Sequence, residues 1–130
     1  MSKKAISTDQ APAAIGPYSQ GVVSGGLLFT SGQLPIDPAT GKIPEGSIQE
    51  KAHIVFKNLA AIAEQAGTHL DNAVKTTVFL ADIANFQAVN EVYAQYFNEP
   101  YPARSAFQVA ALPLGADLEV EAIFQQETDR

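Results

Sequence analysis

The chain has 130 residues, of which 46% are hydrophobic and 17% are charged, and its formal net charge is −6. This length predicts one domain over residues 1–130, large enough to bury about two-thirds of the surface that the unfolded chain exposes. The lysines are scattered and form no basic stripe, which disfavours nucleic-acid binding, and no apolar run approaches the roughly 20 residues of a membrane span.

The absence of cysteine excludes disulfides, thiolate nucleophiles and zinc ribbons. The two histidines, His53 and His69, lie far apart with no pattern of nearby carboxylates, so we expect no metal site. Two lysines near the N-terminus are followed by no apolar segment of the kind a signal peptide needs, and the expected compartment is therefore the cytoplasm.

The first third of the chain predicts short strands and stiff loops. Residues 5–8 predict a short edge strand, followed by a loop over residues 11–21 that contains two prolines and two glycines. Such a loop follows a defined path, so Tyr18 is expected at a fixed place. The segments 21–24 and 27–32, joined by two glycines, predict a β-hairpin.

A long loop and a helix follow the hairpin. The loop over residues 33–46 holds three prolines and two glycines, and a loop of this length in a compact domain is usually functional or covers something. Ser47 and Glu50 fit a capping box, and Gly67 fits a helix stop. Between them an apolar stripe at 48, 52, 55, 59, 62 and 66 predicts a helix of about five turns with one buried face.

The second half predicts a strand over 73–80, a helix over 83–97 capped by Asp82, and a hairpin of strands 101–109 and 118–124. The whole is an α+β fold with a mixed sheet of five to six strands and two helices on one face. The other face keeps apolar side chains, either Phe107 and Val109 or the opposite set, which predicts a homo-oligomer.

Arg104 is the only arginine besides Arg130, the last residue, and it opens an otherwise uncharged strand. A guanidinium in such a place needs an anionic partner. One interpretation is an ion pair with Glu99, or with Glu119 or Glu121, which share one face of the next strand. The other is a ligand carboxylate, which suits the planar fork of donors.

Other candidate residues each have a structural alternative. Glu121, between apolar neighbours, fits an acid or a water-orienting base, or else a solvent-facing edge residue. Tyr18 and Ser31 can donate hydrogen bonds to a substrate, although satisfying strand-end backbone groups is the stronger interpretation for Ser31. Gly32 allows close approach of a ligand, and Asn90 is either a ligand contact or a capping or interface amide.

Several stretches, in order along nearly the whole chain, carry a specific resemblance. They are Ala14-Ile15-Gly16-Pro17-Tyr18-Ser19-Gln20, Thr30-Ser31-Gly32-Gln33, Val74-Lys75-Thr76-Thr77-Val78-Phe79, Val89-Asn90-Glu91-Val92-Tyr93, Tyr101-Pro102-Ala103-Arg104-Ser105 and Val120-Glu121-Ala122. Together they resemble the RidA (YjgF) family of imine and enamine deaminases. The resemblance implies a homotrimer of chorismate-mutase-like domains with a central β-barrel, outer helices and ligand clefts between subunits.

The resemblance also implies a reaction that needs no metal or organic cofactor. Reactive 2-aminoacrylate, or the related enamine from dehydrated threonine, becomes a 2-imino acid, which is hydrolysed to a 2-oxo acid and ammonia. Arg104 would hold the substrate carboxylate and Glu121 would position or activate water. Tyr18, Ser31 and Asn90 would shape the pocket, and the backbone amides of Gly32 and Ala106 would add contacts.

Two departures from the family pattern bear on this expectation. Ala106 stands where many members have cysteine, which removes any thiol role, and the loop 98–100 is shorter than in several members. An alternative function is a ligand-binding or chaperone-like stress protein without turnover. A translation inhibitor acting on RNA is a third, disfavoured by the net charge of −6.

Overall fold

The computed structural model of the protein describes residues 2–127, which form a six-stranded mixed sheet with two helices packed against it. The sheet order is β1-β2-β3-β6-β4-β5, and only the pair β4–β5 is parallel. The strands are β1 (Lys4–Ile6), β2 (Gly21–Ser24), β3 (Leu27–Thr30), β4 (Ala73–Leu80), β5 (Ala103–Gln108) and β6 (Leu118–Gln125). The predicted α+β class is confirmed.

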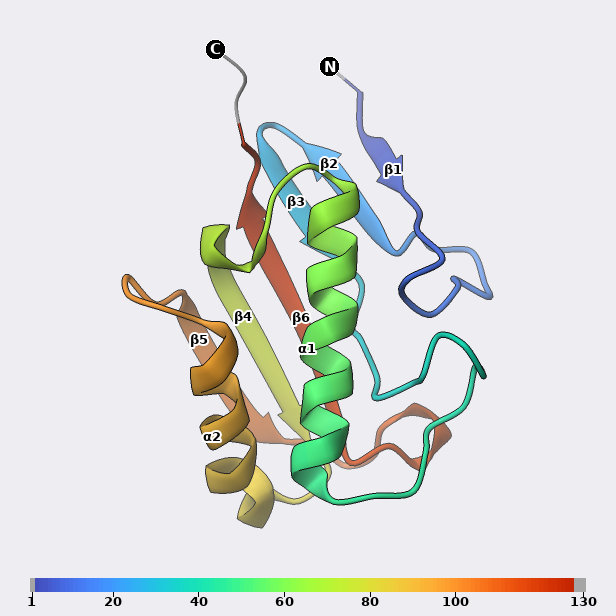
Figure 1. The fold of residues 1–130 in the computed structure, drawn as a ribbon, viewed down its shortest axis with the longest axis vertical. Coiled ribbons are helices and arrows are strands. Elements are labelled where there is room, and N and C mark those ends of the chain that lie inside the picture. The colour runs from blue at the N-terminus through green and yellow to red at the C-terminus, as the bar shows by residue number, and fades with distance from the viewer. Residues whose placement is uncertain (1, 128–130) are drawn as a thin grey trace.

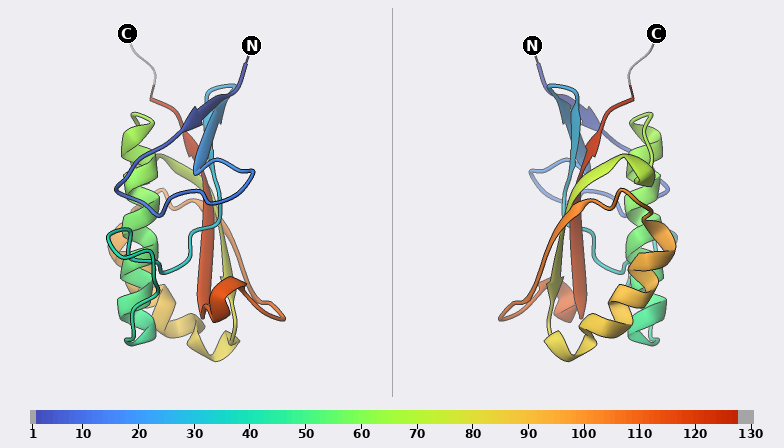
Figure 2. Two further views of the ribbon diagram at one scale, coloured as in Figure 1. Left: turned by 90° about the vertical axis from the view of Figure 1, so that its right-hand side faces the viewer. Right: turned by 90° about the vertical axis from the view of Figure 1, so that its left-hand side faces the viewer.

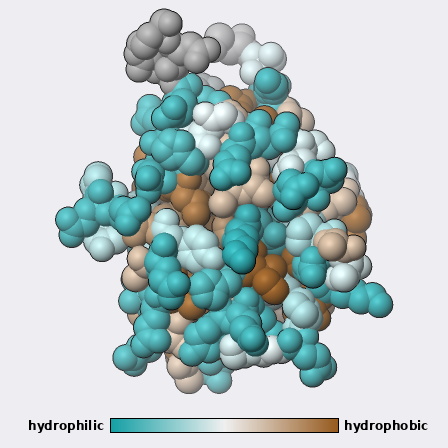
Figure 3. Space-filling view, viewed as in Figure 1, coloured by the Kyte–Doolittle hydropathy of each residue, from teal (hydrophilic) through white to brown (hydrophobic). Residues whose placement is uncertain are grey.

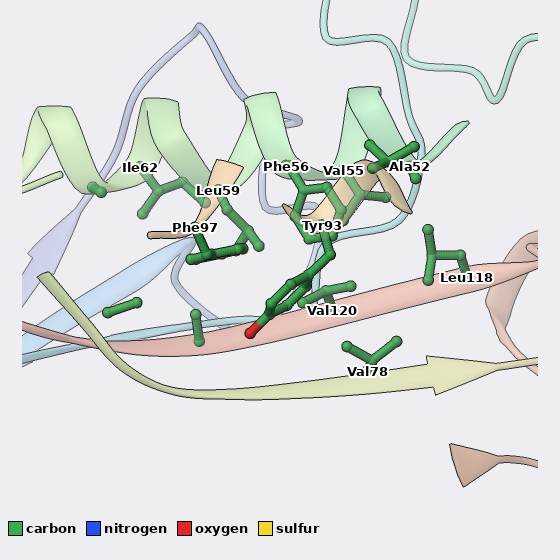
Figure 4. Close-up of a cluster of buried hydrophobic side chains, with 14 of the residues drawn as sticks. Ala52, Val55, Phe56, Leu59, Ile62, Val78, Tyr93, Phe97, Leu118 and Val120 are labelled. Carbon is green, nitrogen blue, oxygen red and sulfur yellow. The ribbon is translucent and has the colours of Figure 1, made fainter. Parts of the chain in front are cut away.

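Both helices, α1 (Ile48–Gln65) and α2 (Phe86–Tyr96), cover the same face of the sheet (Figures 1 and 2). The hydrophobic core fills the space between them and the strands, where Phe56, Phe97 and Phe124 are fully buried. Figure 4 shows core side chains of α1 and α2 pointing toward β4 and β6. Burying each such side chain stabilises the fold by about 1.5–3 kcal/mol, so this core positions the strands that carry the candidate site.

The ends of α1 follow from the local sequence. The hydroxyl of Ser47 accepts from the backbone N–H of Glu50 at 3.1 Å, and the Ser47 N–H donates to the Glu50 carboxylate at 2.8 Å. This is the predicted capping box, and Gly67 takes the left-handed backbone (φ +84°) just beyond the helix. The second helix differs in detail, because Asp82 caps a 3₁₀ turn over Ile83–Asn85 and α2 begins only at Phe86.

The predicted hairpin between the last two strands is wrong. β4 lies between β5 and β6, pairing parallel with β5 and antiparallel with β6. The segment between β4 and β5 contains α2 and is long enough for a parallel crossover. The nine residues between Gln108 and Leu118 then carry the chain past the end of β4 to β6. A tight hairpin between adjacent strands would need fewer residues. The sequence correctly predicts that β5 and β6 run in opposite directions, but it does not predict that β4 lies between them.

No helix covers the other face of the sheet (Figure 2), and the side chains on this open face are partly apolar. Phe29 and Phe107 are each more than 40% exposed, and the Phe79 and Phe107 rings meet edge to face with centroids 5.4 Å apart. The helix side, by contrast, presents a mainly hydrophilic surface (Figure 3). The predicted uncovered apolar face is therefore confirmed. Among residues 2–127, neither helix is both long and apolar enough to cross a membrane.

Candidate functional site: two clusters on opposite faces of the sheet

Arg104 lies on β5 and points toward the helix-covered side of the sheet. Its neighbour across the strand pair is Thr76 of β4, which is fully buried beneath the helices. The Arg104 Nη1 donates to Asn90 Oδ1 on α2 at 2.6 Å. The guanidinium carbon lies 4.7 Å from the centroid of the Tyr93 ring and 5.2 Å from that of Phe86. One face of α2 therefore lies against the guanidinium.

The ion pair that the sequence offered for Arg104 does not form. Within residues 2–127 the salt bridges join other residues, and the polar partner of Arg104 is the amide of Asn90. Arg104 itself is exposed and lines an open cavity of about 410 Å³ together with Asn90, Tyr101 and Pro102. The guanidinium is thus a solvent-accessible cation with no anionic partner in the described part of the chain, as a carboxylate-binding group requires.

Three other predicted residues line a second cavity, of about 520 Å³. Tyr18 comes from the loop before β2, and Ser31 and Gly32 follow the end of β3. The same cavity is lined by Glu119 of β6, for which the sequence analysis predicted no catalytic role. Its remaining walls are mostly apolar, with contributions from Pro12, Ala13, Ile15, Leu34, Ile36, Pro113 and Leu114. The arrangement is a mainly apolar pocket with one carboxylate, two hydroxyls and the side-chain amides of Gln20 and Gln33.

Gly32 and Glu119 are in direct contact. A pair of backbone hydrogen bonds between Gln33 and Val120, of 2.8 and 3.1 Å, ties the segment after β3 to β6. A Cβ added at Gly32 would lie 1.9 Å from Glu119 Oε2, so only glycine leaves the carboxylate where it is. Burial raises the pKa of the Glu119 carboxyl, and the neighbouring negative charge of Glu121 raises it further. Both effects favour the protonated form of the carboxyl, so they make Glu119 a stronger base than an ordinary exposed glutamate.

The loop that carries Tyr18 is held by a buried residue that the sequence analysis missed. The Gln20 side chain is only 4% exposed, and it donates to the carbonyls of Thr8, Ala11 and Pro12 while accepting from the Thr8 N–H. The sequence could have indicated this residue, because Gln20 adjoins the proline-rich loop. A buried side-chain amide must find partners for its N–H groups and its oxygen, and the backbone of such a loop offers them.

The Ser31 side chain also acts within the protein. Its hydroxyl donates to the carbonyl of Ser19 at 2.5 Å, which joins the end of β3 to the loop that carries Tyr18. This is the structural interpretation favoured from the sequence. The hydroxyl oxygen retains lone pairs that can still accept a hydrogen bond.

Glu121 and Ala106 lie apart from this cavity. Glu121 is exposed on β6 and lines a small hollow of about 110 Å³ with Phe29, Thr30, Lys75, Thr77, Ala122 and Ile123. Because β6 is an inner strand of the sheet, Glu121 is not the edge residue considered from the sequence. Ala106 lies on the helix side of β5, partly buried against the core.

The predicted site residues therefore fall into two clusters on opposite faces. Arg104 and Ala122 are both register partners of Thr76, and this row of the sheet faces the helices. Glu119 is the register partner of Phe79, and that row faces the open side, because side chains alternate along a strand. Arg104 and Glu119 of one chain consequently do not share one pocket. Within residues 2–127, no three His, Asp or Glu side chains are grouped as metal ligands.

Comparison with known proteins identifies the family. A family model described as Endoribonuclease L-PSP matches residues 8–126, and the chain belongs to this family, which is also called YjgF/RidA. The resemblance inferred from the sequence motifs is thereby confirmed.

Individual relatives cover nearly all of the chain. The human protein named 2-iminobutanoate/2-iminopropanoate deaminase is 49% identical over 121 residues, which span 93% of this chain and 88% of that protein. The RutC family protein y4sK of Sinorhizobium fredii is 54% identical over 118 residues, spanning 91% and 94% of the two chains. A crystal structure of E. coli TdcF with bound serine superposes with a TM-score of 0.89 at 44% identity, covering 95% and 99%. Both the fold and the expectation of a deaminase-type enzyme agree with these relatives.

Proposed function

We propose that this protein hydrolyses 2-imino acids to 2-oxo acids and ammonia. The imines would form by tautomerisation of 2-aminoacrylate and of the related enamine made from dehydrated threonine. The observation that carries the proposal is the 49% identity, over 93% of the chain, to a protein named for deamination of 2-iminobutanoate and 2-iminopropanoate. An exposed arginine and a carboxylate with a raised pKa supply groups that suit such a reaction.

In the proposed mechanism Arg104 binds the substrate carboxylate with the N–H groups that Asn90 leaves free. Glu119 accepts a proton from a water molecule while the water oxygen attacks the imine carbon. The electron pair of the C=N bond moves to the nitrogen, which takes up a proton to give the carbinolamine. Glu119 then returns its proton to this nitrogen, the C–N bond breaks and ammonia leaves, while the carbinolamine hydroxyl releases its proton and becomes the carbonyl of the 2-oxo acid. The products are a 2-oxo acid and ammonia, so the step consumes one water and needs no oxidant or reductant.

Glu119 takes the role that the sequence predicted for Glu121. Three observations favour it: Glu119 lines the cavity that contains Tyr18 and Ser31, it contacts Gly32, and burial raises its pKa. Glu121 is exposed and lies in a separate hollow, where its charge acts on Glu119. Tyr18 and the lone pairs of Ser31 would orient the substrate nitrogen or the carbinolamine. The backbone amides of Gly32 and Ala106 remain proposed contacts.

We further propose that the complete site forms between subunits of a homotrimer. Arg104 and Glu119 face opposite sides of one sheet, so a single chain cannot place both against one small substrate. The exposed aromatic residues Phe29 and Phe107 on the open face are suited to contacts between sheets that close into a central barrel. A cleft between neighbouring chorismate-mutase-like subunits would bring Arg104 of one chain to Glu119 of the next.

The experiment that tests the function competes hydrolysis against chemical trapping. An amino-acid oxidase generates an imino acid in situ, semicarbazide traps it, and added protein diverts the imine before trapping. Wild-type protein should reduce the trapped product, whereas Arg104→Ala and Glu119→Gln should not, and Glu121→Gln should retain most of the activity. Full diversion by Arg104→Ala would contradict the carboxylate clamp.

A second candidate is a ligand-binding protein without turnover. The structure of TdcF with bound serine supports it, because a member of this fold binds an amino acid there. This function predicts tight binding of 2-oxo acids with no diversion of serine-, threonine- or leucine-derived imines. The family description also names an endoribonuclease, but the net charge of −6 opposes RNA binding. Under the deaminase proposal purified protein leaves single-stranded RNA intact.

A further inference from the structure

The face of α2 that meets β5 carries three side chains that all contact one cation. Phe86, Asn90 and Tyr93 are spaced at i, i+4 and i+7, so they line one side of the helix. All three touch the Arg104 guanidinium, the two rings through their faces and Asn90 through its carbonyl oxygen. We call these three residues the α2 cradle.

The cradle restricts a side chain that is otherwise among the most mobile in proteins. An exposed arginine populates many rotamers, and binding a carboxylate must order them. Here the guanidinium carbon lies 4.7 Å from the Tyr93 ring centroid and 5.2 Å from that of Phe86, both within cation–π range. The 2.6 Å hydrogen bond from Nη1 to Asn90 fixes rotation about the remaining bonds. The orientation of Arg104 is thus set before any ligand arrives.

The Tyr93 wall of the cradle is anchored in the core. Its hydroxyl and that of Thr76, a fully buried β4 residue, are 2.8 Å apart. The Tyr93 ring also packs against Phe97, with centroids 4.4 Å apart, and edge to face against Phe56. Figure 4 shows Tyr93 reaching from α2 toward the sheet among these residues. The wall is therefore rigid, while the cation that it supports is exposed.

We propose that Phe86, Asn90 and Tyr93 are positioning residues that hold Arg104 so that its free N–H edge receives a ligand carboxylate. A guanidinium has five N–H donors, and Asn90 occupies one on Nη1. The Nε–H and Nη2–H donors that form the other edge of the fork stay free for a bidentate carboxylate. The class of ligand, a 2-imino or 2-oxo acid, rests on the proposed function. The contacts of the α2 cradle with Arg104 do not depend on that function.

Two variants and one matched control test the role in binding. Phe86→Leu removes a ring but keeps an apolar side chain, and Asn90→Ala removes the acceptor. Tyr96→Phe is the control, because it deletes a hydroxyl on the next turn of α2 that is 2.8 Å from His53 and does not touch Arg104. Calorimetry compares the affinity for 2-oxobutanoate with that for 2-oxobutanamide, which lacks the carboxylate charge.

Each cradle variant should raise the Kd of 2-oxobutanoate about five- to tenfold. Neither variant should change the Kd of the amide, and Tyr96→Phe should change neither Kd. In an Arg104→Ala background, Phe86→Leu should have no further effect, because the cradle acts only through Arg104. Equal weakening of both ligands, an effect that persists without Arg104, or no effect in either variant would overturn the proposal.

A readout independent of ligand and activity separates this proposal from the proposed function. The chain has only two arginines, so the Arg104 Nε–H signal in a ¹H–¹⁵N spectrum is assignable by its loss in Arg104→Ala. Ring currents from Phe86 and Tyr93 should shift that signal, Phe86→Leu should return it toward the position of a free arginine, and Tyr96→Phe should not. A shifted signal without imine hydrolysis would support the positioning of Arg104 by the α2 cradle and refute the proposed deaminase function. A signal at the free-arginine position in the wild type would refute the cradle.

Discussion

Replacing Gly32 by alanine tests whether Glu119 carries the chemistry. The new Cβ would start 1.9 Å from Glu119 Oε2 and 2.8 Å from its Cδ. An ordinary contact is about 3.5 Å, so the carboxylate must move by about 1.5 Å. The atoms that collide belong to the end of a flexible side chain, so the fold should tolerate the change.

The expected loss of activity follows from that displacement. A misplacement of about 1 Å in a catalytic group can cost 10²-fold in rate, so kcat/KM for imine hydrolysis should fall about 100-fold, which corresponds to about 2.7 kcal/mol. The assay is the semicarbazide competition, with the thermal midpoint recorded for each variant.

Gly46→Ala is the matched control for Gly32→Ala. Its Cβ would lie 2.5 Å from Glu50 Oε1, a similar collision between a new methyl group and a glutamate, but at the capping box of α1. It should lower stability by about 1 kcal/mol and leave kcat/KM unchanged. The reasoning is refuted if Gly32→Ala keeps kcat/KM within threefold of the wild type, or if Gly46→Ala loses as much activity as Gly32→Ala.

Three further results are expected. If Glu119 acts as the base, kcat/KM should fall at acid pH as Glu119 is protonated, and the midpoint of this fall reports its raised pKa. Glu121→Gln should move the midpoint to lower pH, because the mutation removes a negative charge beside Glu119. An unmoved midpoint would show that the Glu121 charge does not act on Glu119. Because the folded state binds the Glu119 proton more tightly than the unfolded state, this group stabilises the fold below the ordinary pKa of 4.5 and the contribution is lost as the pH rises through the folded pKa. Chemical denaturation should therefore show Glu119→Gln gaining stability relative to wild type from pH 4 to neutrality, and a constant difference would contradict the shift. Phe107→Lys places a charge on the open sheet face and should convert the proposed trimer to monomers by light scattering, whereas Gln95→Lys on the exposed side of α2 should not.

The local features of the fold were predictable because adjacent residues decide them. The capping box of Ser47 and Glu50, the stop at Gly67 and the buried stripe of α1 all depend on a few neighbouring positions. The open apolar face was also predictable, since two helices cannot cover both sides of the sheet. The order of the last strands was not, because β5 pairs with β4 through contacts far apart in sequence.

The candidate site shows the same division. Arg104 stood out by its isolation in the sequence, and its exposure agrees with a ligand-binding role. Glu119 and Glu121 were indistinguishable, because alternation along a strand places both on one face. The environments of the two glutamates differ because the bridge between Gln33 and Val120 brings Gly32 against Glu119 and not against Glu121. Such a long-range contact leaves no local pattern in the chain.

The central claim is that Arg104 of one chain and Glu119 of another act on the same imine. Arg104→Ala and Glu119→Gln proteins, each inactive alone, can be unfolded together at equal amounts and refolded to mixed trimers. Random assembly should restore about one quarter of wild-type imine hydrolysis, because a site is complete only when the intact arginine and the intact glutamate come from neighbouring subunits. No recovery from mixtures that refold to trimers as well as the wild type would contradict the shared site.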